Sequence, residues 1–256
     1  METENLFSIK NKVIVITGGG RGIGNMFATS MAKQSAYVYC FDINFPVNIP
    51  KKLSNNLFYV KCNLTNTKKF LMDCKKIYTK FKKIDVLINN LGVTFPNTSK
   101  TSYSKNDWNK TLEINLTTAF NCSETVISFM KKQKSGSIIN ITSINAEFGF
   151  PNNPAYIASK GGLKMLGKSL AKDWGQFGIR VNNLGPGYII TKMTKKSFNN
   201  KKSNVLRKQH TLLNRWGTPD DLVGPTIFLA SNSSEYVTGH DLYVDGGWLA
   251  NGLLSE

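Results

Sequence analysis

Short apolar runs, rich in β-branched residues, alternate with longer amphipathic stretches along nearly the whole chain. The runs are continuously apolar, as in the Val-Ile-Val-Ile of residues 13–16, and do not alternate with polar positions. Continuous apolar strands are buried on both faces, which is typical of a parallel sheet covered by helices. The pattern predicts strands at 13–16, 37–41, 58–60, 86–88, 137–141, 180–184 and 241–244, and helices at 23–34, 68–81, 108–132, 155–177 and 220–230.

This alternation predicts the α/β class. We expect a single Rossmann-like, doubly wound parallel sheet of about seven strands, with helices on both faces, in one domain over residues 1–256. No internal repeat and no Pro- or Ser-rich linker divides the chain. A Lys-, Asn- and Ser-rich segment near 190–213 breaks the alternation, and we expect it to be a mobile insertion beside the site.

The chain is strongly basic, with 33 Lys and Arg against 16 Asp and Glu and a formal net charge of +17. Such a surplus is common in nucleic-acid-binding proteins. However, the lysines are scattered as pairs, and only four basic residues are the arginines suited to bidentate contacts, Arg21, Arg180, Arg207 and Arg215. We therefore expect a solvated surface and no nucleic-acid partner, with a positive field that would steer anionic substrates and cofactors.

Other features of the sequence concern the compartment and exclude several classes of protein. The four cysteines show no CxxC spacing, which predicts neither a disulfide scaffold nor a metal site. No apolar run approaches the ~18 residues that a membrane span needs. The N-terminus also lacks the basic-then-apolar layout of a signal peptide. We therefore expect a cytoplasmic protein with no membrane partner.

A glycine-rich turn follows the first predicted strand and opens the first predicted helix, in the sequence Thr17-Gly18-Gly19-Gly20-Arg21-Gly22-Ile23-Gly24. Glycines allow a tight turn and a close approach of the backbone to a pyrophosphate, which then lies at the helix N-terminus. The strand–turn–helix context predicts a dinucleotide site. A GxxxxGK[ST] P-loop is absent from the sequence.

The second predicted strand is followed by Asp42, 18 residues after Gly24. A carboxylate there accepts hydrogen bonds from the adenosine ribose hydroxyls and repels a 2′-phosphate, which favours NAD over NADP. Arg21 argues in the opposite direction, because a cation in the turn would attract that phosphate. A role for Asp42 in starting the next turn also remains open.

Tyr156 and Lys160 are four residues apart in a predicted helix and therefore share one face. A phenol titrates near pH 10, and a nearby ammonium would lower its pKa toward the range of a general acid/base. Ser143 follows the strand at 137–141, and Asn89-Asn90-Leu91-Gly92 follows the strand at 86–88. Both lie at the carboxyl edge of the sheet, where ligands bind in such folds.

Taken together, these motifs resemble the classical short-chain dehydrogenase/reductase family over essentially the full length of the chain. The matching features are the turn at 17–24, Asn89-Asn90-x-Gly92, Asn115, Ser143, Tyr156-x-x-x-Lys160, Pro186-Gly187 and Val244-Asp245-Gly246-Gly247. The resemblance implies hydride transfer between nicotinamide C4 and a secondary alcohol or ketone, without a metal.

The resemblance also implies a role for each matching residue. Tyr156 would exchange the proton of the substrate oxygen, Ser143 would hydrogen-bond that oxygen, Lys160 would bind the nicotinamide ribose, and Asn115 would anchor a water-linked proton relay. The implied cofactor-binding residues are Gly18, Arg21, Gly22, Ile23, Gly24, Asp42, Asn63, Leu64, Asn90, Gly92, Tyr156, Lys160, Pro186, Gly187, Ile189 and Thr191. Asn63 stands where many relatives have Asp and would bond the adenine amino group through its carbonyl oxygen. Leu91 replaces the usual Ala, which we interpret as a packing change.

Within the family, the stretch from Trp174 onward most resembles gluconate 5-dehydrogenase-type sugar-acid oxidoreductases. Much of it is shared with 3-oxoacyl-carrier-protein reductases, which remain the alternative; a non-catalytic dinucleotide sensor and a nucleic-acid-binding protein are remote ones. Lys192, Lys195 and Lys196 would meet a substrate carboxylate or serve only as solvated loop residues. Asn145 and Glu147 are hypothetical polyol contacts.

The family resemblance implies a homotetramer or a homodimer, built through the helices near 115–132 and 155–177 and through the C-terminal strand. Leu163, Leu166 and Leu170 form an apolar stripe on the second of these helices, and the stripe would serve a core equally well. Trp216 and Trp248 would line a pocket wall or pack in a core or between subunits.

Overall fold

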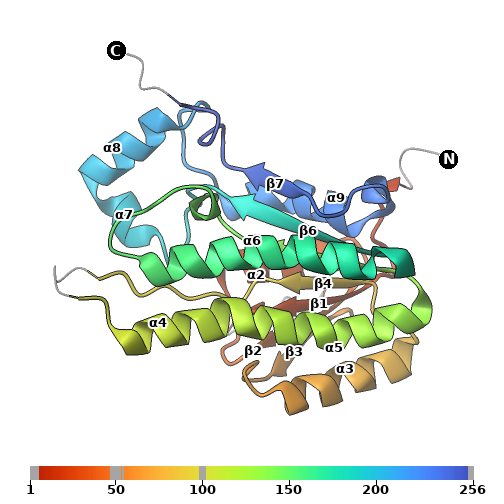
Figure 1. Cartoon of the computed structure of the whole chain (residues 1–256). Coiled ribbons are helices and arrows are strands. Elements are labelled where there is room, and N and C mark those ends of the chain that lie inside the picture. Colours follow the sequence, from red (N-terminus) through yellow and green to blue (C-terminus); the bar gives the residue numbers. More distant parts are fainter. Residues whose placement is uncertain (1–5, 47–52, 54, 98–101, 253–256) are drawn as a thin grey trace.

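The computed structural model describes residues 6–46, 53, 55–97 and 102–252. In this part of the chain a parallel sheet of seven strands has the order β3-β2-β1-β4-β5-β6-β7 (Figure 1). The predicted α/β class is confirmed: β7 has the predicted bounds, and the other six strands extend their predicted runs by one to three residues. The strands are β1 Val13–Thr17, β2 Tyr37–Asp42, β3 Leu57–Lys61, β4 Val86–Asn89, β5 Gly136–Ile141, β6 Ile179–Pro186 and β7 Asp241–Val244.

Helices cover both faces of the sheet. Alternate residues of β1 point to opposite faces, because side chains alternate along a strand. Ile14 and Ile16 enter one core, which α2 and α9 close, while Val13 and Val15 enter the other, which α3, α5 and α6 close. The helices are α2 Gly22–Lys33, α3 Thr67–Phe81, α4 Lys105–Leu112, α5 Thr118–Gln133, α6 Pro154–Trp174, α7 Lys195–Asn199, α8 Lys201–His210 and α9 Val223–Ala230.

The predicted helix at 108–132 has a wider turn within it. A π-helical segment, Glu113–Thr117, joins α4 to α5. Its Asn115 is fully buried, and its side chain hydrogen-bonds the backbone of Val93, in the loop after β4. Such π segments are frequent at functional sites, where they re-aim a side chain from a helix.

The segment near 190–213 contains two short helices that the sequence pattern did not predict. In α8, the side chain of Asn200 caps the N-terminus by accepting a hydrogen bond from the Ser203 amide at 3.0 Å. Figure 1 shows α7 and α8 beyond the carboxyl ends of β6 and β7. The segment therefore lies at the edge of the sheet where the site was predicted. Its mobility stays a prediction.

The leucine stripe of α6 belongs largely to the protomer core. Leu163 and Leu170 are buried, and Leu166 packs partly buried against the core that contains Leu170. All four cysteines are buried free thiols. Among the described residues, no helix is long and apolar enough to cross a membrane, and no three His, Cys, Asp or Glu residues cluster as metal ligands would.

Candidate active site

The glycine turn connects β1 to the N-terminus of α2 and is tied to the end of β4. Gly18 has a φ of +66°, and a Cβ on it would lie 2.8 Å from Leu91 Cα. A Cβ on Gly24 would lie only 2.3 Å from Gly18 O, so neither position accepts a side chain. The Asn90 amide donates to Thr17 O at 3.1 Å and to Gly18 O at 2.8 Å. Asn90 thus holds the turn in place, a role that sequence reasoning missed.

The space in front of this helix terminus fits an anionic group. Gly22 has a φ of +56°, and nothing lies within 4 Å of where its Cβ would be. Arg21 precedes it as an exposed N-cap residue. The next residue, Ile23, packs partly buried against the first core and anchors the turn of helix. Unpaired amides and the helix dipole favour a phosphate at such a position.

Asp42 is buried at the end of β2, next to the glycine turn. One carboxylate oxygen accepts from the Gly20 amide at 3.0 Å, and the other accepts from the amides of Ile43 and Asn44 at 2.7 and 3.1 Å. The carboxylate therefore does two things: it starts the following turn, and it joins that turn to the predicted pyrophosphate site. A carboxylate can accept about four hydrogen bonds, so acceptor capacity remains for a ribose hydroxyl.

The predicted adenine contacts are less open than expected. The Asn63 side-chain oxygen accepts from the Thr65 amide at 3.2 Å and from the Thr65 hydroxyl at 3.0 Å. These bonds use both of its lone pairs, so a bond to an adenine amino group has to displace one of them. Leu64 is buried in the second core, which leaves its backbone as the part able to contact a ligand.

Four predicted catalytic residues come together at the carboxyl edge of the sheet. Ser143 lies two residues beyond β5, and its hydroxyl hydrogen-bonds Tyr156 on the first turn of α6. Lys160 is 3% exposed, and its ammonium donates to Ile141 O at 2.6 Å. The Asn115 amide reaches the same helix, donating to Ser159 Oγ at 3.0 Å.

Gly92 also belongs to this cluster. A Cβ at Gly92 would lie 3.6 Å from Lys160 Nζ and 3.7 Å from Asn115 Oδ1. The family resemblance implies that Gly92 is a cofactor-binding residue. The structure places it next to the predicted catalytic lysine, because the chain turns toward α6 after β4.

Burial dominates the acid–base behaviour of the tyrosine–lysine pair. It raises the pKa of Tyr156, and the hydrogen bond with Ser143 offsets only part of the rise. It also lowers the pKa of Lys160 to about 8. The expected lowering of the Tyr156 pKa by Lys160 is therefore wrong for this arrangement of side chains. The ammonium lies 5.8 Å from the phenol ring centroid and is directed to a backbone carbonyl.

The residues predicted to contact the nicotinamide end lie in a strip, residues 186–191, which begins at the last residue of β6 and is held by hydrogen bonds to neighbouring segments. Pro186 pairs with Val244, and the Gly187 amide donates to Val244 O at 3.0 Å. Ile189 is buried and forms a bridge with Gly217. The Thr191 amide donates to Thr194 Oγ1 at 2.9 Å.

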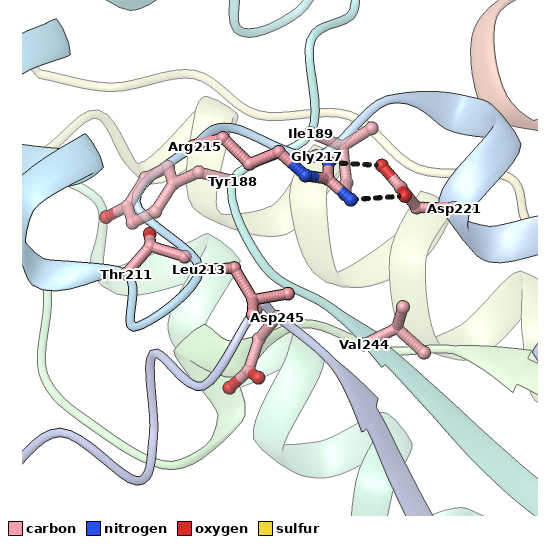
Figure 2. Close-up of a pocket in the computed structure, with 10 residues that line it drawn as sticks. Tyr188, Ile189, Thr211, Leu213, Arg215, Gly217, Asp221, Val244 and Asp245 are labelled. Atoms are coloured by element: carbon pink, nitrogen blue, oxygen red, sulfur yellow. Dashed lines mark hydrogen bonds and ion pairs between the residues drawn. The ribbon is translucent and has the colours of Figure 1, made fainter.

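A cavity of about 130 Å³ lies behind this strip, and Figure 2 shows the residues that line it. Arg215 and Asp221 form a two-pronged ion pair there, with N–O distances of 2.7 and 2.8 Å. Asp221 also accepts from the Thr218 amide at 2.7 Å. The pair fixes the segment that contains Gly217 and therefore braces Ile189 from behind.

The candidate substrate contacts outside the four-residue cluster differ in their exposure and in their hydrogen bonds. Glu147 is bonded to Lys164 and to the Tyr243 hydroxyl, so its carboxylate is engaged with β7 and α6. Lys192, Lys195 and Lys196 all have exposed side chains. The backbone N–H of Asn145 donates a hydrogen bond to Ser143 Oγ at 3.1 Å.

The comparisons with known proteins cover almost the whole chain. A family model described as Enoyl-(Acyl carrier protein) reductase matches residues 18–249. The 5-keto-D-gluconate 5-reductase of Escherichia coli (strain K12) is 34% identical, over 96% of this chain and 98% of its own length. This chain belongs to the short-chain dehydrogenase/reductase family. It is an oxidoreductase of the class that uses a nicotinamide cofactor, NAD or NADP.

Two further relatives bear on substrate and cofactor. The 3-oxoacyl-[acyl-carrier-protein] reductase of Chlamydia muridarum (strain MoPn / Nigg) is also 34% identical, over 93% of this chain and 97% of its own length. A crystal structure of a gluconate 5-dehydrogenase from Burkholderia cenocepacia J2315, in complex with NADP and tartrate, superposes with a TM-score of 0.87. It is 28% identical and covers 96% of this short-chain dehydrogenase/reductase and 98% of its own chain.

Proposed function

We propose that this chain interconverts a keto group and a secondary alcohol of a sugar acid, using a nicotinamide cofactor and Tyr156 as the general acid/base. The observation that carries the proposal is the meeting of Ser143, Tyr156, Lys160 and Asn115 at the same sheet edge as the glycine turn. The similarity to gluconate-type oxidoreductases supports the substrate class.

The residues of the cluster divide the acid–base work between them. Nicotinamide, when bound, supplies or accepts the hydride at C4. In the reductive direction Tyr156 donates its proton to the substrate oxygen, while the Ser143 hydroxyl hydrogen-bonds the same oxygen. Burial keeps the phenol protonated at neutral pH, so Tyr156 is a competent proton donor for reduction.

Lys160 and Asn115 support the proton path. With a pKa of about 8, Lys160 is mostly protonated at pH 7 yet gives up its proton more readily than an exposed lysine. Its ammonium would bind the nicotinamide ribose hydroxyls. Asn115, held by the π segment against Val93, would anchor the water-linked relay that returns a proton to Tyr156 through Lys160.

The cofactor would extend along the sheet edge from the glycine turn at 17–24 to the strip at 186–191. Asp42 favours NAD, because its negative charge lies beside the turn that would hold the pyrophosphate. The similar gluconate 5-dehydrogenase of known structure holds NADP, and Arg21 suits a 2′-phosphate. We propose NAD as the preferred cofactor, tested by comparing kcat/KM for NADH and NADPH.

Assembly into a homotetramer, or a homodimer, is part of the proposal. Phe120 on α5 and Met165 on α6 are exposed apolar residues, as is Trp108 on α4. Apolar side chains on these neighbouring helices would be covered by a second protomer. Light scattering coupled to size-exclusion chromatography measures the assembly directly.

A 3-oxoacyl-carrier-protein reductase is the second candidate, favoured by the relative from Chlamydia muridarum. A substrate panel separates the two. Turnover of keto-sugar acids supports our proposal, while turnover of 3-oxoacyl thioesters alone supports the alternative. If the protein binds NADH but turns over no substrate of the panel, the result supports a non-catalytic dinucleotide sensor.

A further inference from the structure

Arg207, which sequence reasoning treated only as part of the basic surface, lies in a group of aromatic rings. Its guanidinium carbon is 4.4 Å from the ring centroid of Tyr188, 5.6 Å from that of Trp216 and 6.0 Å from that of Phe150. Tyr188 and Trp216 also contact each other edge to face, at 5.5 Å. We refer to Phe150, Tyr188, Arg207 and Trp216 as the Arg207 cluster.

Two buried N–H donors in this cluster lack an acceptor. Arg207 Nη1 and Trp216 Nε1 are both inaccessible to solvent and make no hydrogen bond in the described part of the chain. The Trp216 side chain is 95% buried, since only 5% of the residue is exposed. Buried polar groups are nearly always paired, because a buried donor without an acceptor is unfavourable.

Arg207 also has no carboxylate partner among the described residues. Two other arginines, in contrast, have acceptors for their guanidinium groups. Arg215 forms an ion pair with Asp221, and Arg180 donates to the carbonyls of Leu229 and Ser231. A guanidinium held against aromatic rings is oriented and partly desolvated, which strengthens its attraction for an anion. Arg207 hydrogen-bonds the uncharged Tyr188 hydroxyl, so its positive charge has no counter-ion among the described residues and suits an anionic ligand.

The cluster joins two segments that flank the proposed catalytic residues. Phe150 lies in the connection between Ser143 and α6, which begins two residues before Tyr156. Tyr188 directly follows Gly187 in the strip proposed for the nicotinamide end. Arg207 reaches both from α8, which Figure 1 places beyond the carboxyl ends of the strands.

We propose that Arg207 binds the carboxylate of the substrate and that Trp216 Nε1 donates a second hydrogen bond to it. This inference rests on the proposed sugar-acid function and assigns the specificity of that site. A guanidinium matches the two oxygens of a carboxylate, whereas the uncharged thioester end of an acyl chain offers no such partner. Arg207 takes the role that the exposed Lys192, Lys195 and Lys196 were suggested to fill.

Paired ligands test the assignment without relying on turnover. Gluconate and sorbitol differ by a carboxylate in place of a hydroxymethyl group. We would titrate each by calorimetry into protein saturated with NADH, at constant ionic strength, because neither ligand presents a keto group to reduce. Lys208→Met is the matched control, since Lys208 is the exposed neighbour on α8 and its loss changes the net charge equally.

A charge-assisted hydrogen bond contributes about 1.5–3 kcal/mol, which corresponds to roughly 10- to 100-fold in affinity. We expect Arg207→Met to weaken gluconate binding by that factor and to leave sorbitol binding unchanged. Arg207→Lys retains part of the preference, and Trp216→Phe loses up to about tenfold. Unchanged NADH affinity in each variant shows that the fold is intact.

Equal loss of both ligands in Arg207→Met, or equal gluconate affinity in Arg207→Met and Lys208→Met, overturns the inference. In the first case Arg207 only fixes α8 to the domain. The proposed function can fail separately. If the wild type binds gluconate through Arg207 but reduces no keto-sugar acid, the anion site is supported and the proposed reaction is refuted. If a keto-sugar acid is turned over and Arg207→Met does not affect the rate, the reaction is supported and the anion site is refuted.

Discussion

Replacing Lys160 by Met should change how the stability of this protein depends on pH. Lys160 is only 3% exposed, and its ammonium donates a hydrogen bond to Ile141 O. Burial lowers its pKa from 10.5 to about 8, so the folded state holds this proton less tightly than the unfolded state does. Met has a similar volume and no charge, so the variant removes the titration while filling the space.

The size of the effect follows from the two pKa values. Moving a pKa from 10.5 to about 8 corresponds to about 3 kcal/mol of destabilisation below pH 8, where both states keep the proton. As the pH rises through 8 toward 10.5, the unfolded state holds more protons, so the penalty falls and the wild type gains stability. Between pH 7 and pH 9.5 the gain is about 2 kcal/mol relative to Lys160→Met.

Urea unfolding followed by circular dichroism at pH 7 and pH 9.5 measures this difference. Both proteins are compared at one protein concentration, so that any assembly affects them alike. We expect the free energy of unfolding of the wild type to rise relative to that of the variant by about 2 kcal/mol. A constant difference between the two proteins across this range would show that Lys160 titrates as in an exposed chain, and the account of its burial would be refuted.

Three further predictions concern cofactor choice, the core and the thiols. Asp42→Asn keeps one acceptor oxygen but removes the charge, and should lower the NADH-to-NADPH ratio of kcat/KM by roughly tenfold or more; an unchanged ratio means that Asp42 serves only the turn. Arg180→Met removes the guanidinium hydrogen bonds to the carbonyls of Leu229 and Ser231, which keep only serine hydroxyls as donors, and should lower the urea unfolding free energy by about 1–3 kcal/mol, whereas a loss below about 0.5 kcal/mol argues that those hydroxyls suffice. Burial raises the pKa of every cysteine thiol, to about 12 for Cys122, so a thiol reagent at pH 8 should label all four sites only after unfolding; rapid labelling of the folded protein would contradict this.

The sheet was predictable because its strands are buried on both faces. A run such as residues 13–16 is apolar at every position, and the two cores show why: Ile14 and Ile16 enter one, Val13 and Val15 the other. The π segment was not predictable in this way. It inserts a wider turn into a stretch whose polarity pattern continues unbroken, and within it the Asn115 side chain hydrogen-bonds the distant backbone of Val93.

The helices at 195–210 were missed because their residues carry little helical signal. The segment is rich in Lys, Asn and Ser, with few apolar residues at helical spacing. In the structure α8 gains its support from a cap at Asn200 and from the contacts of Arg207 with distant rings. Long-range contacts of this kind leave no local pattern in a sequence.

For the site, the sequence predicted where the residues lie but not all of their contacts. Motif spacing placed Ser143, Tyr156 and Lys160 at one sheet edge, and the structure brings them together there. It did not show that the Asn90 amide would reach back to the glycine turn, since that depends on the side-chain orientation. Nor did it show that Lys160 is buried and Tyr156 half-buried, and burial decides both pKa directions.

The central claim is that Tyr156 transfers a proton during reduction of a keto-sugar acid by a nicotinamide cofactor. The most direct test is to follow NADH and NADPH absorbance with keto-sugar acids, neutral ketoses and 3-oxoacyl thioesters, using wild type and Tyr156→Phe. Our account predicts turnover of a keto-sugar acid with NADH, reduced by roughly 10²- to 10⁴-fold in the variant, which keeps the ring and loses the proton. Equal rates in the two proteins, or turnover of 3-oxoacyl thioesters alone with NADPH, would contradict it.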